Sequence, residues 1–72
     1  MKINTVNVLE IIDGTPFKIE SFKDNPIGNK QAEKLFKKIA KENEALEENL
    51  ESFIEDGFYN YGDECGVYLI HS

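Results

Sequence analysis

The stretch INTVNVLEIIDGTPFKIESF, residues 3–22, decides the fold. β-Branched and other apolar residues dominate both of its halves, with polar residues between them, and this composition is typical of strands. Asp13 and Gly14 separate the two halves. Both residues tolerate the positive φ angles of a two-residue type I′ turn, so the pair predicts a tight hairpin. We expect one strand over residues 3–12 and a second over residues 15–22.

The first of these strands has two apolar faces. Val6 and Val8 share one face of the expected strand, and Leu9 and Ile11 share the other. Either a bulge or burial on both faces would explain this pattern. Pro16 has no N–H group to donate, so it belongs beside the turn or on an edge of the sheet.

An amphipathic helix is expected after the hairpin. Residues 23–29 read as a loop because Asn25-Pro26 and Gly28 interrupt regular structure, and Asn29 is the expected N-cap. From there apolar residues recur at helical spacing. They are Ala32, Leu35, Phe36, Ile39 and Ala40, followed by Leu46, Leu50, Phe53 and Ile54.

A change of charge near Asn43 predicts a break in this helical region. Residues 29–43 carry five lysines and two glutamates, whereas residues 44–72 carry eight acidic residues and no lysine. One long helix would set this charge order against its macrodipole, while two helices would place lysines at the end of the first and acids at the start of the second. We therefore expect two helices. The alternative is one helix over residues 29–56 with a continuous apolar seam, in which Asn43 sets the register of an antiparallel helix-pair dimer.

The rest of the chain completes an α+β domain. Asp56-Gly57 ends the helical region, residues 58–61 are candidates for an extended segment, and residues 62–64 form a turn. Residues 66–70 are expected to be the last strand. The chain thus predicts one domain, residues 1–72, with an antiparallel sheet of three or four strands packed on a helical region, in the order β-β-α-(α)-(β)-β.

Length and residue types argue against an enzyme. A chain of 72 residues has no room for a large enclosed cofactor pocket. Its single cysteine, Cys65, and single histidine, His71, would lie about 20 Å apart along an extended strand, too far to form a catalytic pair. Two such ligands also do not make a zinc site. We expect no catalytic residue, no metal and no cofactor.

Composition also bears on partners and location. All eight basic residues are lysine and the net charge is −6, which argues against direct nucleic-acid binding. No apolar run approaches the length of a membrane span, and no charged segment leads into a long apolar run, so we expect neither a membrane protein nor a signal peptide. A lone cysteine forms no disulfide within the chain, which fits the reducing cytoplasm.

The acids of the C-terminal half are the sharpest candidate for a binding surface. In a helix over residues 44–56, four glutamates share one face, which would dock on a basic protein surface or would simply be solvated. Tyr59 and Tyr61 share one face of the segment that follows, either as interface anchors or as core residues. The candidate partner-binding residues are Glu44, Glu47, Glu48, Glu51, Glu55, Tyr59, Tyr61, Asp63 and Glu64.

The chain resembles small uncharacterised proteins of phages and bacterial mobile elements. The resemblance rests on AEKLFKKIAKE at residues 32–42, on the glycine- and aromatic-rich turn in EDGFYNYGDECGVYLIHS at residues 55–72, and on the final VYLI strand. It covers most of the chain and supplies no catalytic residues. It implies a setting in which small acidic proteins inhibit or modulate host proteins, including defence systems.

These observations together predict a small acidic protein that binds another protein. We expect a non-enzymatic modulator, such as a phage or mobile-element inhibitor of a host defence or nucleic-acid-binding protein, that docks its acidic C-terminal surface on a basic partner. The alternative is a self-associating structural protein that uses the helical seam and has no dedicated ligand. Either a monomer or a homodimer is compatible with the sequence.

Overall fold

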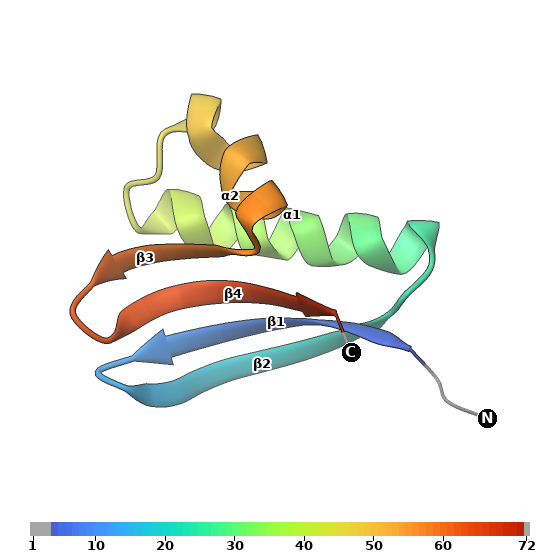
Figure 1. Cartoon of the computed structure of the whole chain (residues 1–72), viewed down its shortest axis with the longest axis horizontal. Helices are drawn as coiled ribbons and strands as arrows, with labels where there is room; N and C mark the ends of the chain where they lie inside the picture. Colours follow the sequence, from blue (N-terminus) through green and yellow to red (C-terminus); the bar gives the residue numbers. More distant parts are fainter. Residues whose placement is uncertain (1–3, 72) are drawn as a thin grey trace.

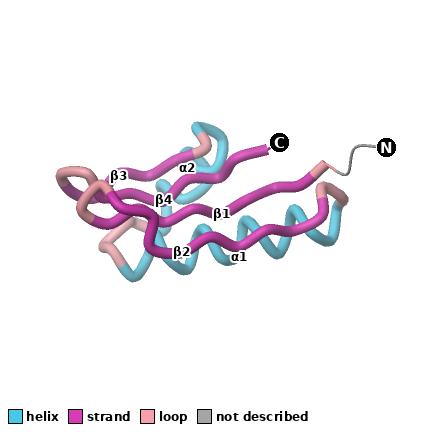
Figure 2. The backbone as a smooth tube through the Cα atoms, turned by 90° about the horizontal axis from the view of Figure 1, so that it is seen from below, coloured by secondary structure: helices cyan, strands magenta, loops and turns pink. Residues whose placement is uncertain are grey.

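The computed structural model describes residues 4–71 and confirms the expected α+β class. Its elements are β1 (Thr5–Ile12), β2 (Thr15–Lys23), α1 (Pro26–Glu42), the 3₁₀ turn η1 (Glu47–Asn49), α2 (Leu50–Asp56), β3 (Phe58–Gly62) and β4 (Cys65–His71). The four strands form one antiparallel sheet in the order β2-β1-β4-β3. Helix α1 runs across one face of that sheet, and α2 lies beside α1 near β3 (Figures 1 and 2). The expected strand position at residue 3 lies outside the described residues.

The hairpin forms as the sequence predicts. Asp13 and Gly14 have φ angles of 54° and 77°, the two positive values of a type I′ turn. Strand pairing shifts register next to the turn, where Ile11 pairs with Pro16 and Glu10 pairs with Lys18. The extra residue of this bulge lies in β2, so it is the second strand of the hairpin, and not the first, that is bulged.

The start of α1 differs from the expectation. The N-cap is Asn25, whose side-chain Oδ1 accepts a hydrogen bond from the backbone N–H of Gly28 at 2.7 Å. Pro26 occupies the first turn, where backbone N–H groups have no acceptor within the helix, so the missing N–H of proline costs nothing. Its fixed φ also favours the helix. The expected N-cap, Asn29, is wrong, because Asn-Pro here starts a helix and does not interrupt one.

The helical region is broken at the expected place. Helix α1 ends with Asn43 as its C-cap, and Glu44 adopts a left-handed φ of 71°. The N–H of Ala45 then bonds back to the carbonyl of Ala40 at 3.0 Å, which satisfies a carbonyl at the end of the helix. Helix α2 ends at Gly57, which has a φ of 86°, as predicted for a left-handed C-terminal glycine.

The core lies between α1 and the sheet. Its buried members are Val6, Val8, Val67 and Leu69 from the strands and Ala32, Phe36 and Ile39 from α1. The alternative of one helix over residues 29–56 is wrong, because α1 ends at Glu42 and α2 begins at Leu50. The apolar stripe of α1 packs against the sheet, and Leu46, at the break, is 58% exposed. No helix within residues 4–71 is long and apolar enough to cross a membrane.

Candidate protein-binding surface

One face of the sheet carries apolar side chains that no helix within residues 4–71 covers. Ile19 of β2 pairs with Leu9 of β1, Leu9 pairs with Tyr68 of β4, and Tyr68 pairs with Phe58 of β3. Paired residues of an antiparallel sheet share a face, so these four side chains form one row across all four strands. Val8, next to Leu9 in sequence, is buried under α1, so the row points away from that helix.

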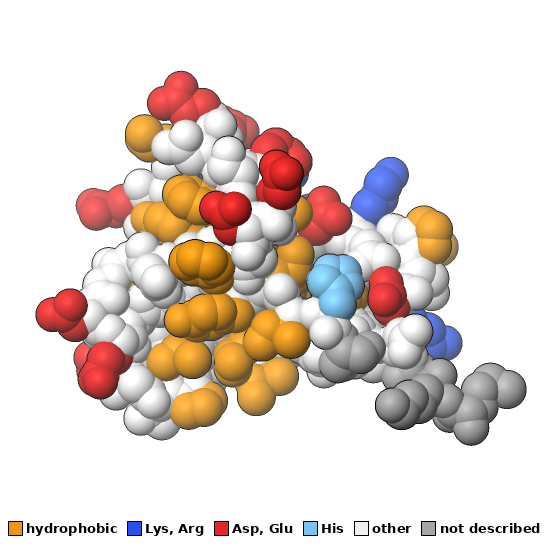
Figure 3. Space-filling model, in the orientation of Figure 1, with side chains coloured by type: hydrophobic (Ala, Val, Ile, Leu, Met, Phe, Trp, Pro, Cys, Tyr) orange, Lys and Arg blue, Asp and Glu red, His pale blue; other side chains and the backbone are white. Residues whose placement is uncertain are grey.

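Two isoleucines extend this row along the strands. Ile70 lies two residues from Tyr68 in β4, and Ile11 lies two residues from Leu9 in β1. We name the six residues the open face: Leu9, Ile11, Ile19, Phe58, Tyr68 and Ile70. Ile19 is 61% exposed, and Phe58 and Ile70 are each 43% exposed. Figure 3 shows hydrophobic side chains gathered over the strands on the side of the sheet away from α1.

The open face has an aromatic pair on its β3 side. The rings of Phe58 and Tyr68 stack with their centroids 6.2 Å apart and an interplanar angle of 25°. The Tyr68 hydroxyl donates a hydrogen bond to Oδ1 of Asn60 at 3.2 Å, which fixes the direction of the ring. Rigid aromatic side chains of this kind lose little conformational entropy when a partner covers them.

Acidic side chains stand around two sides of the open face. Figure 3 shows them over α2 and at the end of the sheet where the β1–β2 and β3–β4 turns lie. The acids of the two turns are Asp13, Asp63 and Glu64. The turns also contact each other, because the N–H of Gly14 bonds to the carbonyl of Glu64 at 2.8 Å. Asp13 was not among the acids predicted for the binding surface, because its place beside Glu64 depends on strand pairing.

The predicted row of glutamates is divided by the break. Glu44 lies in the connection after α1, Glu47 and Glu48 lie in η1, and Glu51 and Glu55 lie in α2. The expected helix over residues 44–56 therefore begins later, and Glu44 is not on its face. Asp63 and Glu64 lie in the β3–β4 turn, so the predicted acids form two separate groups.

Two of these glutamates contact lysines of α1. Nζ of Lys37 lies 2.8 Å from Oε1 of Glu51, and this hydrogen bond raises the pKa of Lys37. Nζ of Lys41 lies 3.7 Å from Oε1 of Glu47. Both pairs are largely solvent-exposed, so each contributes little to stability, but both hold η1 and α2 against α1. The same lysines line a shallow open hollow of about 480 Å³ with Lys34, Lys38 and Glu42.

The predicted tyrosines lie on the helix side of the sheet. The ring centroids of Tyr59 and of Phe53 in α2 lie 4.5 Å apart. The Tyr59 hydroxyl donates a hydrogen bond to the backbone carbonyl of Asn43 at 3.0 Å. The Tyr61 hydroxyl donates to Oε2 of Glu10 at 2.9 Å. Partial burial, followed by this hydrogen bond, raises the pKa of Tyr61 well above its ordinary value. The aromatic residue of this segment on the open face is Phe58, and the alternation of β3 is the signal that separates it from Tyr59.

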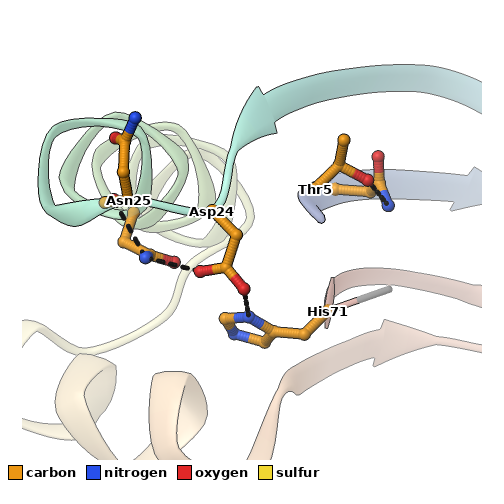
Figure 4. Close-up of polar contacts among 6 residues, drawn as sticks. Thr5, Asp24, Asn25 and His71 are labelled. Atoms are coloured by element: carbon orange, nitrogen blue, oxygen red, sulfur yellow. Dashed lines mark hydrogen bonds and ion pairs between the residues drawn. The ribbon is translucent and has the colours of Figure 1, made fainter. Parts of the chain in front are cut away.

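The cysteine and the histidine lie at opposite ends of β4. Cys65 is a half-buried free thiol at the start of the strand, and the exposed His71 is at its end. Nδ1 of His71 lies 3.9 Å from Oδ2 of Asp24, just before α1 (Figure 4). Oδ1 of the same carboxylate accepts a hydrogen bond from the side chain of Asn29 at 2.9 Å. Within residues 4–71, no three potential metal ligands lie close enough together to hold an ion.

No protein-family model, curated protein or solved structure matches the chain.

Proposed function

We propose that this protein is a non-enzymatic binding module that docks its open face on another protein. The observation that carries the proposal is the row Ile19, Leu9, Tyr68 and Phe58, which crosses the whole sheet with no helix of the described chain over it. A contiguous exposed apolar patch on a small soluble domain marks an interaction site more often than scattered apolar residues do. Phe58 and Tyr68 would supply the aromatic anchors.

The charge around the open face selects the chemistry of the partner. Asp13, Asp63 and Glu64 at the turns and the acids over α2 form an acidic border. A complementary partner has an apolar centre surrounded by lysine and arginine. Peripheral charges of this kind raise the association rate and exclude wrong partners, while the apolar centre supplies most of the affinity. In this proposal the predicted acids border the binding surface, and the open face of the sheet is its centre.

The setting of the proposal comes from the sequence resemblance. Similarity to small phage and mobile-element proteins suggests a host protein as the partner, and a defence or nucleic-acid-binding protein would offer the basic surface that the acidic border requires. The module would then act in the cytoplasm as an inhibitor or modulator, and its effect would follow from covering the partner's surface.

Site-specific photo-crosslinking tests the proposal. A photoreactive phenylalanine analogue at position 58 would report contacts at the open face, and the same analogue at position 34, on the exposed side of α1, is the matched control. In host lysate we expect position 58, and not position 34, to crosslink to one protein. That protein is then purified and titrated with the unlabelled chain by calorimetry.

The titration separates the contribution of the open face from that of the acidic border. We expect Ile70→Asp to weaken binding at least about tenfold, because it buries a charge within the interface. Neutralising Asp63 and Glu64 together should slow association and reduce its dependence on salt. If the purified partner binds Ile70→Asp as tightly as the wild type, the open face is not the docking surface. If position 58 captures no protein in repeated trials, the proposed function is wrong.

A further inference from the structure

Strand β2 is an edge of the sheet that no other described element covers. It pairs with β1 on one side, and Figure 1 shows no element beyond it on the other. Of its nine residues, all but Phe22 are exposed. Edge strands present unpaired backbone groups, and natural proteins either block these groups or use them to add a strand.

The register shows which backbone groups of β2 point outward. The N–H of Asp24 bonds to the carbonyl of Asn4 at 3.1 Å, so residues 4 and 24 form a hydrogen-bonded pair. Such pairs alternate with non-hydrogen-bonded ones along an antiparallel ladder. Ile19 pairs with Leu9, five steps along the ladder, and therefore belongs to a non-hydrogen-bonded pair. The N–H and C=O of Ile19 and Ser21 thus point away from β1, toward solvent.

The side chains around Ile19 are complementary to a second copy of themselves. An antiparallel second β2 with Ile19 opposite Ile19 brings Lys18 of each copy opposite Glu20 of the other. Lys18 and Glu20 lie on one face of the strand and are both exposed. Neither has an ion-pair partner within residues 4–71 of the single chain. Residues 18 and 20 would form non-hydrogen-bonded pairs across the new junction, in which side chains approach most closely.

Other registers lack this complementarity. Outward-pointing groups must face each other, so the two strands can shift only to centre on another outward residue. A register centred on Glu20 is excluded for that reason, because the backbone groups of Glu20 point toward β1. That register would also place Glu20 opposite Glu20, a like-charge pair. Centring on Ser21 places Glu20 opposite Phe22.

We propose that two copies of this chain pair through β2, antiparallel and centred on Ile19, to join their two four-stranded sheets into one. The two-fold axis passes between the two Ile19 residues, perpendicular to the sheet. Backbone hydrogen bonds between the two Ile19 residues and two Lys18–Glu20 pairs hold the junction. The two open faces then lie side by side on the same side of the joined sheet. The bulge and Pro16 end the pairing toward the turn, because a proline offers no N–H.

Charge-swap variants test this dimer by analytical ultracentrifugation up to about 1 mM, a range that covers weak association. The wild type should dimerise with rising concentration. Glu20→Lys places lysine opposite lysine twice, and Lys18→Glu places glutamate opposite glutamate twice. Each variant alone should bind itself at least about tenfold more weakly than the wild type does. An equimolar mixture of the two restores both attractive pairs and should form a heterodimer as tight as the wild-type dimer.

A matched control separates the register from net charge. Glu48→Lys in η1 makes the same change from the net charge of −6 as Glu20→Lys, but lies away from β2. It should leave dimerisation unchanged or slightly stronger. Circular dichroism confirms that each variant is folded. A wild type that stays monomeric throughout the range overturns the proposal. So does a Glu20→Lys variant that dimerises like the wild type, or a mixture that does not associate. A loss in Glu48→Lys equal to that in Glu20→Lys also overturns it.

Discussion

The hydroxyl of Tyr59 donates a hydrogen bond to the backbone carbonyl of Asn43 at 3.0 Å. This bond joins β3 to the point where the helical region breaks. The bond explains why Tyr59, although it follows the acidic segment, packs against the core and is not an exposed binding residue.

Tyr59→Phe should lower the free energy of unfolding by about 1 kcal/mol, because it removes this bond and keeps the ring against Phe53. Urea unfolding measures the change. Tyr68→Phe is the control, since its hydroxyl donates to the exposed Asn60, and it should cost less than about 0.5 kcal/mol. Equal effects of the two substitutions would contradict a structural role for the Asn43 contact.

Glu44→Gly should stabilise the protein by about 1 kcal/mol. Glu44 has a φ of 71°, which glycine adopts without the steric cost that a side chain incurs. Thermal unfolding should show a higher midpoint for this variant. Glu48→Gly, within η1, should instead lower the midpoint, because glycine there loses more conformational freedom on folding. A destabilised Glu44→Gly would mean that its side chain makes a contact worth more than the backbone strain.

Local signals account for the parts of the fold that the sequence predicted well. The Asp13-Gly14 turn and the end of α2 at Gly57 depend on the φ preference of single residues. The break near Asn43 follows from the charge order along the chain. The start of α1 was missed although its signal was also local, because Asn25-Pro26 fits both a loop and an N-cap followed by proline.

The binding surface was harder to predict because it depends on which face of the sheet is covered. Val6 and Val8 alternate with Leu9 and Ile11, and both sets are apolar, so periodicity gives the two faces without saying which one α1 covers. Burial on both faces was one expectation. The chain has a single layer of helix over the sheet, so one apolar face stays open. The position of α1 also decides that Tyr59 faces the helices and that Phe58 lies on the open face.

The Lys37–Glu51 pair should show a small coupling free energy. A double-mutant cycle with Lys37→Met and Glu51→Gln isolates it, and we expect about 0.5 kcal/mol at low salt because both side chains reach solvent. High salt should reduce the coupling. The looser Lys41–Glu47 pair, at 3.7 Å, should give a smaller value in the parallel cycle. A coupling that salt does not change would contradict an exposed ion pair.

Tyr61 should titrate at higher pH than an ordinary tyrosine. Burial and the bond to Glu10 raise its pKa in the folded protein, whereas the unfolded chain has a value of about 10. The stabilisation from protonated Tyr61 is therefore complete below pH about 10 and is lost as the pH rises above it. Tyrosinate absorbance of the wild type minus that of Tyr61→Phe isolates the group. A difference curve with an ordinary midpoint in the folded protein would refute this account, and in urea the midpoint should return to that value.

Gly28→Ala should destabilise the protein by about 2 kcal/mol, because a Cβ at this position would lie 1.9 Å from the backbone carbonyl oxygen of Lys23. Neither atom can move freely: Gly28 is in the first turn of α1, and the segment after Lys23 is held by the Asn25 cap. Alanine otherwise favours a helix, so a loss of stability isolates the clash. Gly62→Ala is the control, since its Cβ would meet Cys65 at an ordinary 3.5 Å, and it should change stability by less than about 0.5 kcal/mol. Urea unfolding of both variants decides the matter: if Gly28→Ala is as stable as the wild type, the close approach of β2 to α1 is not as described.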